Sequence, residues 1–318
     1  MGVVQNGSAG FHHIHFYIIM RKIVIAGGSG FLGLSLETYF KSKGDEVVIL
    51  SRKPTASQVY WDGKSLGDWV DALEGSDALI NLSGKSVDCR YNQSNSQKIF
   101  SSRIESTRVL NEAMLKCKNP PKVWLNASSA TIYIHAENEE MTEHNGIIGD
   151  DFSMNICKSW EAEFFGTTIS QVRKVALRTS IVLGENGGAF PKMKWLSKLG
   201  FGGKQGNGEQ YMSWIHINDF CKAVAFILQN ESIEGAINIT SPKPIKNHQF
   251  TNTLRKTLKV PFGFSQSRFL LELGSVVIGT ETELLLKSRK VYPQKLIESG
   301  FVFDYANLTK AFENLCFG

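Results

Sequence analysis

Seven consecutive residues near the start of the chain have the composition of a turn that holds phosphate groups: Gly27, Gly28, Ser29, Gly30, Phe31, Leu32 and Gly33. They follow the apolar segment 23–26, which predicts a buried strand, and they precede a segment with helical periodicity. In this context Gly27 permits a tight turn, Gly30 lets the backbone approach a pyrophosphate, and Gly33 allows the helix to pack closely. Free N–H groups at the start of the helix would face the phosphates. The pattern predicts a dinucleotide site; a glycine-rich helix start without a ligand is the alternative interpretation.

The end of the second predicted strand indicates which dinucleotide binds. The chain reads Ser51-Arg52-Lys53 there, without the carboxylate that accepts hydrogen bonds from the 2′-hydroxyl of NAD. Arg52 offers a planar fork to a 2′-phosphate, and Lys53 adds positive charge. We therefore expect NADP(H) to bind at Ser51, Arg52 and Lys53, with NAD(H) as the weaker ligand. The alternative interpretation is that Arg52 and Lys53 are solvated loop residues.

The elements that must position these residues alternate along the chain from Met20 onward. Strands are expected at 23–26, 46–50, 59–61, 78–82 and 123–126. A helix should follow the glycine turn as far as Phe40, and a short one should span 69–73. A longer helix is expected to carry one apolar face, made of Phe100, Ile104, Thr107, Leu110 and Met114. The alternation predicts right-handed βαβ units and therefore an α/β fold, a Rossmann-type doubly wound parallel sheet covered on both faces.

The domain organisation follows from where this alternation stops. We expect a dinucleotide-binding Rossmann domain at 20–185 and a smaller C-terminal region at 186–318 that covers the substrate. Within residues 1–19, the segment 11–19 is apolar and aromatic but short, without a basic start or a small-residue cleavage site. We interpret residues 1–19 as a tag, a leader or a mis-assigned start before Met20; an extra strand or a partner-binding segment is the alternative.

Composition excludes several classes of function. The net charge of +5 is spread along the chain, and no basic run is interleaved with aromatic residues, so no nucleic-acid partner is expected. No stretch of 18 residues is continuously apolar, so no membrane span is expected. The five cysteines are odd in number and far apart, which favours reduced thiols in the cytoplasm over a disulfide framework or a metal site. We expect a cytoplasmic protein with a small-molecule substrate, and a homodimer is left open.

Further segments resemble the extended short-chain dehydrogenases, a family that includes UDP-galactose epimerase. Residues 128–133 (SSATIY) are similar to the motif on the fifth strand of that family, and 177–184 (LRTSIVLG) are similar to its sixth-strand block. The resemblance implies that Asp62 reaches the adenine amine. It also implies that four residues after the fourth strand flank the cofactor: Asn81, Leu82, Ser83 and Gly84.

The chain is more similar still to an atypical branch of this family, usually called epimerase family proteins, which has a C-terminal domain of its own. The likeness rests on the segments 187–193 (GGAFPKM), 202–210 (GGKQGNGEQ), 213–219 (SWIHIND), 287–296 (KSRKVYPQKL) and 300–303 (GFVF). It covers nearly the whole chain from Met20 onward. This branch has no settled substrate, so the resemblance implies a fold and a cofactor more than a reaction.

In the wider superfamily a Tyr passes the proton, a Lys four residues later lowers the pKa of that Tyr and holds the ribose, and a Ser polarises the substrate oxygen. The resemblance assigns Ser129 and Lys158 to the last two positions. The residue four before Lys158 is Met154, whose thioether has no proton to give. Tyr133 is the best substitute as a catalytic residue, and packing in the core or against substrate is the equal alternative. For Lys158 the alternative is a solvated helix residue.

A second departure from the family concerns the substrate. Members that use nucleotide sugars grip the diphosphate with an Arg before the final motif, and Met212 stands at that place here. A methionine cannot make charge-assisted bonds to phosphate, so nucleotide sugars are poor candidates. Asp219 is interpreted as the N-cap of the next helix. Four residues are candidate substrate contacts, the last with a structural histidine as the alternative: Arg90, Met154, Trp214 and His216.

Two hypotheses about function result. The first is an NADP(H)-dependent oxidoreductase of the short-chain dehydrogenase type that acts on a small carbonyl or alcohol. In it, Ser129 hydrogen-bonds the reacting oxygen, Lys158 fixes the ribose, and Tyr133 or a water handles the proton. The second is a non-catalytic NADP(H)-binding sensor or regulatory protein, which has lost its acid–base group at Met154.

Overall fold

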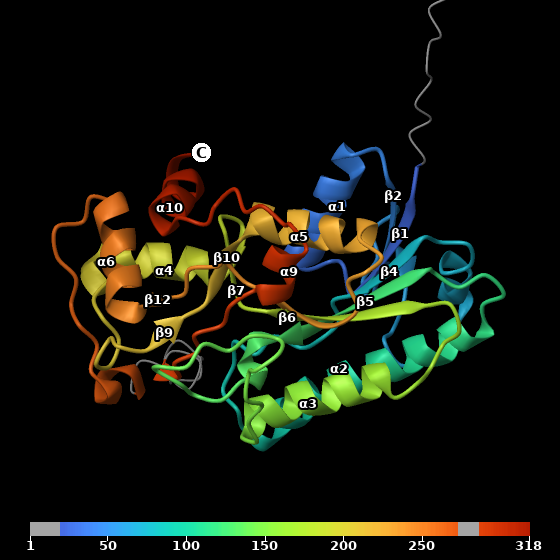
Figure 1. Ribbon diagram of the computed structural model, residues 1–318, viewed down its shortest axis with the longest axis horizontal. Helices are drawn as coiled ribbons and strands as arrows, with labels where there is room; N and C mark the ends of the chain where they lie inside the picture. The colour runs from blue at the N-terminus through green and yellow to red at the C-terminus, as the bar shows by residue number, and fades with distance from the viewer. Residues whose placement is uncertain (1–19, 273–285) are drawn as a thin grey trace, which may run out of the picture.

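The computed structural model describes residues 20–272 and 286–318, so the expectation for residues 1–19 lies outside the described residues. The centre of the described part is a parallel sheet of seven strands (Figure 1). In chain order these strands are β1 (Lys22–Ala26), β2 (Glu46–Ser51), β3 (Val59–Tyr60), β4 (Ala78–Asn81), β5 (Val123–Ser129), β6 (Arg173–Thr179) and β11 (Gly235–Ile239). The fold is therefore the predicted Rossmann-type α/β fold.

The strand order creates the crevice that the glycine turn requires. The order is β11-β6-β5-β4-β1-β2-β3, so the chain first adds strands on one side of β1 and then on the other. Val24 of β1 pairs with Val48 of β2 and with Leu79 of β4, all in parallel register. In such sheets a ligand binds outside the carboxyl ends of the two strands where the order reverses. Those strands are β1 and β4.

Helices cover both faces of the sheet because successive strand residues point to opposite sides. Ile23 and Ile25 belong to the apolar core beneath α1 (Phe31–Ser42) and α5 (Ile217–Gln229). Val24 and Ala26 belong to the core beneath α2 (Gln93–Lys116) and α3 (Phe152–Phe165). Figure 1 shows the two helix pairs on opposite faces of the sheet. A short 3-10 helix, η1 (Asp68–Ala72), replaces the helix expected at 69–73.

The apolar face of the long helix differs by one residue from the expected one. Ile99 is fully buried, whereas the side chain of Phe100 is 42% exposed. Adjacent residues in a helix are about 100° apart, so only one of the two can face the sheet. Ile104, Thr107, Leu110 and Met114 are buried on that face as expected.

Most of the remaining elements form a smaller layer beside the main sheet. Its strands are β7 (Ile181–Gly184), β8 (Gly187–Gly188) and β10 (Trp214–His216) in one sheet, with β9 (Tyr211–Met212) and β12 (Ile245–Lys246) in another. Its helices are α4 (Phe190–Leu196), η3 (Ser197–Phe201), α6 (Asn247–Thr257) and α10 (Leu308–Phe317). Two short elements lie against the main sheet instead: η2 (Ala130–Ile132) follows β5, and α9 (Gln294–Glu298) packs next to β11. Leu183, Phe190, Trp214, Phe250 and Phe312 share one apolar core in this layer.

The segment after residue 185 contributes to the main sheet as well as to the smaller layer. The strand β11 belongs to this segment and pairs with β6 at the edge of the main sheet. Phe220 and Val224 of α5, and Leu296 of α9, pack into the core of that sheet. The later part of the chain therefore completes the Rossmann sheet as well as forming the smaller layer.

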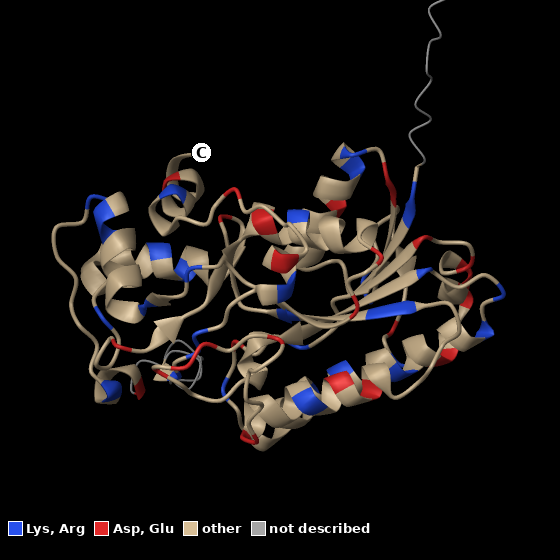
Figure 2. Ribbon diagram, viewed as in Figure 1, with Lys and Arg blue, Asp and Glu red and all other residues tan. Residues whose placement is uncertain are grey.

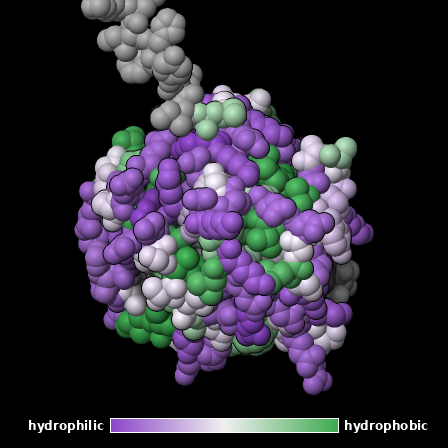
Figure 3. Space-filling view, turned by 90° about the vertical axis from the view of Figure 1, so that its right-hand side faces the viewer, coloured by the Kyte–Doolittle hydropathy of each residue, from purple (hydrophilic) through white to green (hydrophobic). Residues whose placement is uncertain are grey.

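The surface of the described part is mixed in character. Both basic and acidic side chains lie along α2 and α3 (Figure 2). The face shown in Figure 3 is mainly hydrophilic, with hydrophobic side chains in separate groups. All five cysteines are free thiols, and Cys157 and Cys221 are buried. Within residues 20–272 and 286–318, no helix is both long and apolar enough to cross a membrane.

Candidate dinucleotide and substrate site

The glycine turn after β1 is tightly packed on two sides and open on the third. Gly27 has a φ of +71°, and a Cβ placed on it would lie 2.7 Å from Ser83 Oγ. A Cβ on Gly33 would lie 2.2 Å from the carbonyl oxygen of Gly28, so this position requires glycine for the helix to pack on the turn. A Cβ on Gly30 would meet no atom within 4 Å. The open side of the turn is therefore at Gly30.

The start of α1 fits the phosphates of a dinucleotide. Gly30 is the N-cap, and no side chain caps the first turn of the helix. Uncapped N–H groups and the helix dipole favour an anion at this position. The hydroxyl of Ser83 beside Gly27 is buried and has no hydrogen-bond partner in the described part of the chain. An orphaned donor and an uncapped helix start at one crevice suit a pyrophosphate group.

The predicted adenosine end lies after β2 and β3. Ser51 is buried, and its Oγ accepts the N–H of Lys53 at 3.2 Å, while the side chains of Arg52 and Lys53 are exposed. Asp62 Oδ1 accepts the N–H groups of Lys64 at 2.8 Å and Ser65 at 2.9 Å. These hydrogen bonds hold the pKa of Asp62 below its usual value. One carboxylate oxygen of Asp62 thus shapes its own loop, which leaves the other for a ligand.

The segment after β4 is held from below by an amide network. Asn81 is fully buried; its Nδ2 donates to Asn126 Oδ1 at 2.7 Å and to Thr107 Oγ1 at 3.3 Å. Its Oδ1 accepts the N–H of Ser83 at 3.0 Å. Asn81 therefore positions the turn rather than facing the crevice. Leu82 is partly buried and Gly84 is exposed at the rim of the crevice.

A chain of hydroxyl and thiol groups follows β5. Ser129 Oγ accepts hydrogen bonds from the backbone N–H of Thr131 at 3.2 Å and from its Oγ1 at 2.9 Å. Thr131 Oγ1 lies 3.4 Å from the sulfur of Cys157 in α3. Burial raises the pKa of the Cys157 thiol. Because Ser129 Oγ is the acceptor in both bonds, its own hydrogen is available to a ligand oxygen.

Tyr133 does not face the crevice, which corrects the expectation that it substitutes for the missing catalytic Tyr. The turn η2 follows β5 and directs the ring inward, so the side chain is fully buried. Its hydroxyl donates to Asn238 Oδ1 at 2.9 Å and accepts from Arg178 Nη1 at 3.0 Å. Burial raises the pKa of Tyr133 above its usual value. This environment agrees with core packing, the alternative stated for this residue, and leaves no proton for transfer.

Lys158 and Met154 lie one turn apart on α3 in different surroundings. Lys158 is exposed and makes no hydrogen bond or ion pair with the described residues. Met154 is 4% exposed, and a Cβ on Gly149 would lie 2.1 Å from its sulfur. Met154 is therefore covered by the segment that contains Gly149. Of this pair, only Lys158 has a side chain free to meet a cofactor.

A buried ion pair that the sequence analysis did not single out anchors this region. Arg178 of β6 donates from Nε and Nη2 to the carboxylate of Glu161 in α3, at 2.9 and 2.8 Å. Ser128 donates to the same carboxylate at 2.6 Å. These bonds fix α3 against β5 and β6, next to Ser129. An arginine within an apolar strand segment was the available signal, since a buried charge requires a partner.

Two candidate substrate contacts in β10, Trp214 and His216, have structural roles. Trp214 is buried, and its Nε1 donates to the carbonyl oxygen of Lys243 at 3.2 Å. His216 is the N-cap of α5: its Nδ1 accepts the N–H of Asn218 at 3.1 Å. Burial lowers the pKa of His216 to about 4, so the ring is neutral near pH 7. His216 thus matches the structural alternative.

The role expected of Asp219 was wrong, because His216 caps the helix three residues earlier. Both carboxylate oxygens of Asp219 accept backbone N–H groups, from Asp304 and Tyr305, each at 2.9 Å. Asp219 therefore ties the start of α5 to a distant C-terminal segment. Arg90 is exposed before α2, and its carbonyl oxygen accepts from Asn95 Nδ2 at 2.8 Å.

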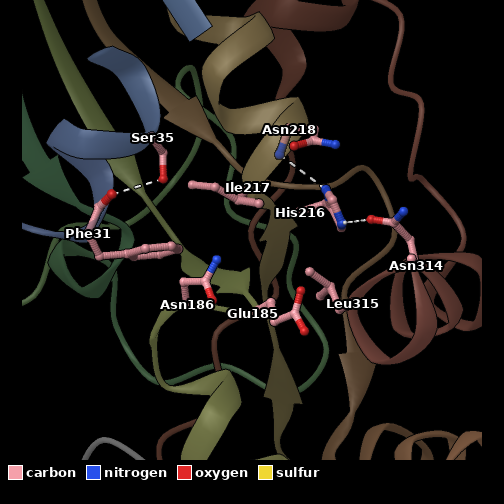
Figure 4. Close-up of a pocket in the computed structure, with 10 residues that line it drawn as sticks. Phe31, Ser35, Glu185, Asn186, His216, Ile217, Asn218, Asn314 and Leu315 are labelled. Carbon is pink, nitrogen blue, oxygen red and sulfur yellow. Dashed lines mark hydrogen bonds between the residues drawn. The ribbon is translucent and has the colours of Figure 1, made fainter. Parts of the chain in front are cut away.

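A cavity of about 200 Å³ lies beside the start of α1 (Figure 4). Phe31 begins α1, and its ring lines this cavity together with His216 and Asn314. His216 Nε2 and Asn314 Oδ1 are 3.1 Å apart. Neither Ser129 nor Lys158 lines this cavity, whereas His216 does.

The family follows from two matches along the chain. A model of the NAD dependent epimerase/dehydratase family matches residues 23–240, which include every strand of the main sheet except its first residue. The chain belongs to the NAD dependent epimerase/dehydratase family. A domain of unknown function, DUF1731, matches residues 268–315. The predicted resemblance to epimerase family proteins with their own C-terminal domain is thereby confirmed.

Relatives of this epimerase/dehydratase chain are similar over nearly their whole length. Epimerase family protein SH2119 of Staphylococcus haemolyticus is 33% identical over 93% of this chain and 99% of its own. The crystal structure of human epimerase family protein SDR39U1 (isoform 2) with NADPH is 28% identical, covers 92% of this chain and 98% of its own, and has a TM-score of 0.85. UDP-N-acetylglucosamine 4-epimerase from Bacillus cereus shares the fold, with 19% identity, coverage of 93% and 95%, and a TM-score of 0.73.

Proposed function

We propose that this protein is an NADP(H)-dependent oxidoreductase that acts on a small carbonyl or alcohol. The observation that carries the proposal is the crevice at β1 and β4, where an uncapped α1, the open side of Gly30 and the orphaned Ser83 hydroxyl come together. These groups suit a pyrophosphate. The human relative with NADPH supports the choice of cofactor.

In this proposal the 2′-phosphate lies at the end of β2. Arg52 and Lys53 are exposed there and supply positive charge, and no carboxylate ends the strand. Ser51 supports the loop through its bond to the N–H of Lys53. Asp62 uses its second carboxylate oxygen for the adenine amine. A guanidinium binds a phosphate through several charge-assisted hydrogen bonds, which NAD(H) cannot offer at this position.

The chain's own residues orient the reacting groups and polarise the substrate. The cofactor supplies the hydride chemistry when it is bound. Ser129 donates its free hydrogen to the reacting oxygen of the substrate, and Lys158 holds the nicotinamide ribose from α3. With Tyr133 bonded to Asn238 and Arg178, a water in the crevice supplies the proton.

Nucleotide sugars are not the proposed substrates. Met212 ends β9, at the position where nucleotide-sugar enzymes of the family have an arginine for the diphosphate, and it is 8% exposed. Its sulfur accepts a hydrogen bond from Asn247 Nδ2 at 3.3 Å. A buried thioether offers neither charge nor donors to a phosphate. We place the protein in the cytoplasm, where its free thiols would stay reduced.

A second function, an NADP(H) sensor without turnover, is favoured by one observation. Neither Met154 nor Tyr133 can provide the acid–base group: the first is a covered thioether, and the second is fully buried and bonded. General acid–base help commonly contributes about 10²–10⁴ in rate, and a protein without it is a weak catalyst. Binding alone would need only the crevice.

The experiment that separates the two functions follows the nicotinamide absorbance of NADPH with a broad panel of aldehydes, ketones and oxo acids. The oxidoreductase predicts turnover of at least one class, and Ser129→Ala should lower kcat by about 10²-fold or more. NADPH affinity should stay within about twofold, because Ser129 contacts the substrate oxygen. The matched control is Ser42→Ala at the exposed end of α1. NADPH binding without turnover of any carbonyl would favour the sensor.

A further inference from the structure

Arg103 of α2 lies beneath the turn that follows β4, at the edge of the crevice. A Cβ on Gly84 would lie 3.1 Å from its guanidinium carbon. Nη1 donates to the carbonyl oxygens of Ile99 at 2.9 Å and Lys85 at 3.1 Å. The guanidinium carbon lies 5.0 Å from the centre of the Trp160 ring in α3. The side chain is partly exposed, and its packing between two helices and a turn fixes its direction.

Three of the arginines that pair with carboxylates bind both carboxylate oxygens at once. Arg21, Arg108 and Arg178 each donate from Nε and Nη2 to the two oxygens of one carboxylate. This side-on fork matches the geometry of a planar anion. Among the described residues, Nε and Nη2 of Arg103 donate to no protein atom, and no carboxylate forms an ion pair with it.

The groups around Arg103 do not compensate its charge. The ionisable side chains that face it are Cys157, Tyr91 and Cys89, which are neutral in their ordinary state. Burial lowers the pKa of the Arg103 guanidinium. Arg173 also lacks a carboxylate, but it donates from both Nη atoms to three carbonyl oxygens near the end of α5. A partly desolvated charge is costly unless it is paired, so Arg103 is suited to an anion from outside the chain.

The position of Arg103 links it to the reacting end of the crevice. The guanidinium packs on Trp160, which lies one turn after Cys157 in α3. The sulfur of Cys157 lies 3.4 Å from Thr131 Oγ1, which donates to Ser129 Oγ. Arg103 and the hydroxyl that we assign to the reacting oxygen therefore both lie beside this part of α3. An anionic group held there would place a neighbouring carbonyl near Ser129.

We propose that Arg103 binds a carboxylate or phosphate group of the substrate through Nε and Nη2, so that the substrate is an anionic carbonyl or alcohol. This inference deepens the proposed function and rests on it for the position of the substrate. A carboxylate and a phosphate share the planar or near-planar pair of oxygens that the fork recognises. A neutral aldehyde would leave the guanidinium unpaired and would bind more weakly.

The test uses the full chain saturated with NADPH and two probes, succinate and inorganic phosphate, at ionic strength matched with potassium chloride. Titration calorimetry should detect at least one probe, and Arg103→Met should weaken its binding about tenfold or more. The control is Arg108→Met, which removes the same charge from the same helix at the Glu163 pair. It should change probe affinity less than twofold. If Arg103→Met does not fold, Arg103→Lys keeps the charge without the fork and should weaken the probe several-fold.

A titration with NADPH shows whether Arg103 binds an anionic group of the substrate or a phosphate of the cofactor. NADPH affinity within about twofold of the wild type in Arg103→Met supports a substrate anion. A tenfold loss of NADPH affinity, with probes that compete with NADPH, would assign the fork to the cofactor's phosphates and overturn the inference. Equal probe binding in all variants, or none in the wild type, would also overturn it. None of these measurements requires turnover. If the probes bind through Arg103 but no carbonyl oxidises NADPH, the oxidoreductase proposal is contradicted and the anion site at Arg103 is not.

Discussion

Gly30→Ala tests whether a dinucleotide occupies the open side of the phosphate turn. The backbone of Gly30 has φ −91° and ψ 177°, which alanine adopts without strain, and a Cβ there would meet no atom within 4 Å. The change should therefore cost only about 1 kcal/mol of unfolding free energy, because alanine is a poorer N-cap than glycine.

The same methyl group should strongly weaken NADPH binding. Backbone N–H groups must approach the pyrophosphate at about 2.9 Å, and a methyl at Gly30 would hold the phosphate away from them. A hydrogen bond to a charged group contributes about 1.5–3 kcal/mol, so the loss of one or two gives about tenfold to several hundredfold weaker binding. Titration calorimetry with NADPH measures the affinity, and urea unfolding without cofactor measures the stability.

Two further glycines serve as controls for this comparison. Gly44→Ala places alanine at a φ of +85° with open space around it, so it should cost about 1–2 kcal/mol without changing NADPH affinity. Gly33→Ala drives a Cβ to 2.2 Å from a backbone oxygen, and it should cost about 3 kcal/mol or more even without cofactor. If Gly30→Ala binds NADPH as tightly as the wild type, the pyrophosphate does not lie over the turn and the cofactor proposal fails.

Three other substitutions give separate outcomes. Arg52→Ala should weaken NADPH about tenfold or more and change NADH less than twofold; equal losses by calorimetry would remove Arg52 from the 2′-phosphate site. Tyr133→Phe should lower the unfolding free energy by about 1–3 kcal/mol, because Asn238 and Arg178 each lose a buried hydrogen bond to the hydroxyl. The affinity for NADPH should not change. Urea unfolding at the wild-type midpoint would contradict this prediction. Folding lowers the pKa of His216 from 6.5 to about 4, so between these pH values the unfolded state binds a proton that the folded state does not. The free energy of unfolding is therefore highest above pH 6.5 and should fall by roughly 3 kcal/mol as the pH drops to 4. His216→Asn keeps a capping side chain, so urea midpoints should lose this part of the pH dependence.

The features that the sequence predicted are those with a local pattern. The parallel sheet follows from apolar segments of strand length that alternate with helical ones, and these periods are visible within ten to twenty residues. The phosphate turn follows from the glycine-rich segment, because only its sequence neighbours are needed to form it. The family resemblance added Asn81 and Ser83, whose positions depend on β4 lying next to β1.

The features that the sequence did not predict depend on contacts between distant segments. The Tyr133 hydroxyl meets Asn238, which is 105 residues away, and no periodicity signals such a pair. Its place after a strand suggested the pocket, but the turn η2 reverses the chain and directs the ring inward. Asp219 was assigned as a cap because helix ends are uncertain by one or two residues from sequence, and α5 begins at Ile217.

In the proposed function, Met154 in place of the family's tyrosine limits the reactions that this site can catalyse. The side chain of Met154 is covered. Arg178 donates hydrogen bonds both to Glu161 and to the Tyr133 hydroxyl, so the polar side chains of these three residues are already paired with one another. The remaining groups that can meet a ligand are a hydroxyl with a free hydrogen, an exposed lysine and the fork of Arg103. Such a set can orient an anionic substrate and polarise one oxygen, but it has no strong proton donor at the reacting atom. Carbonyls that are already activated, such as those next to a carboxylate, need the least proton transfer in the transition state, and they are therefore the substrates on which this arrangement would be most effective.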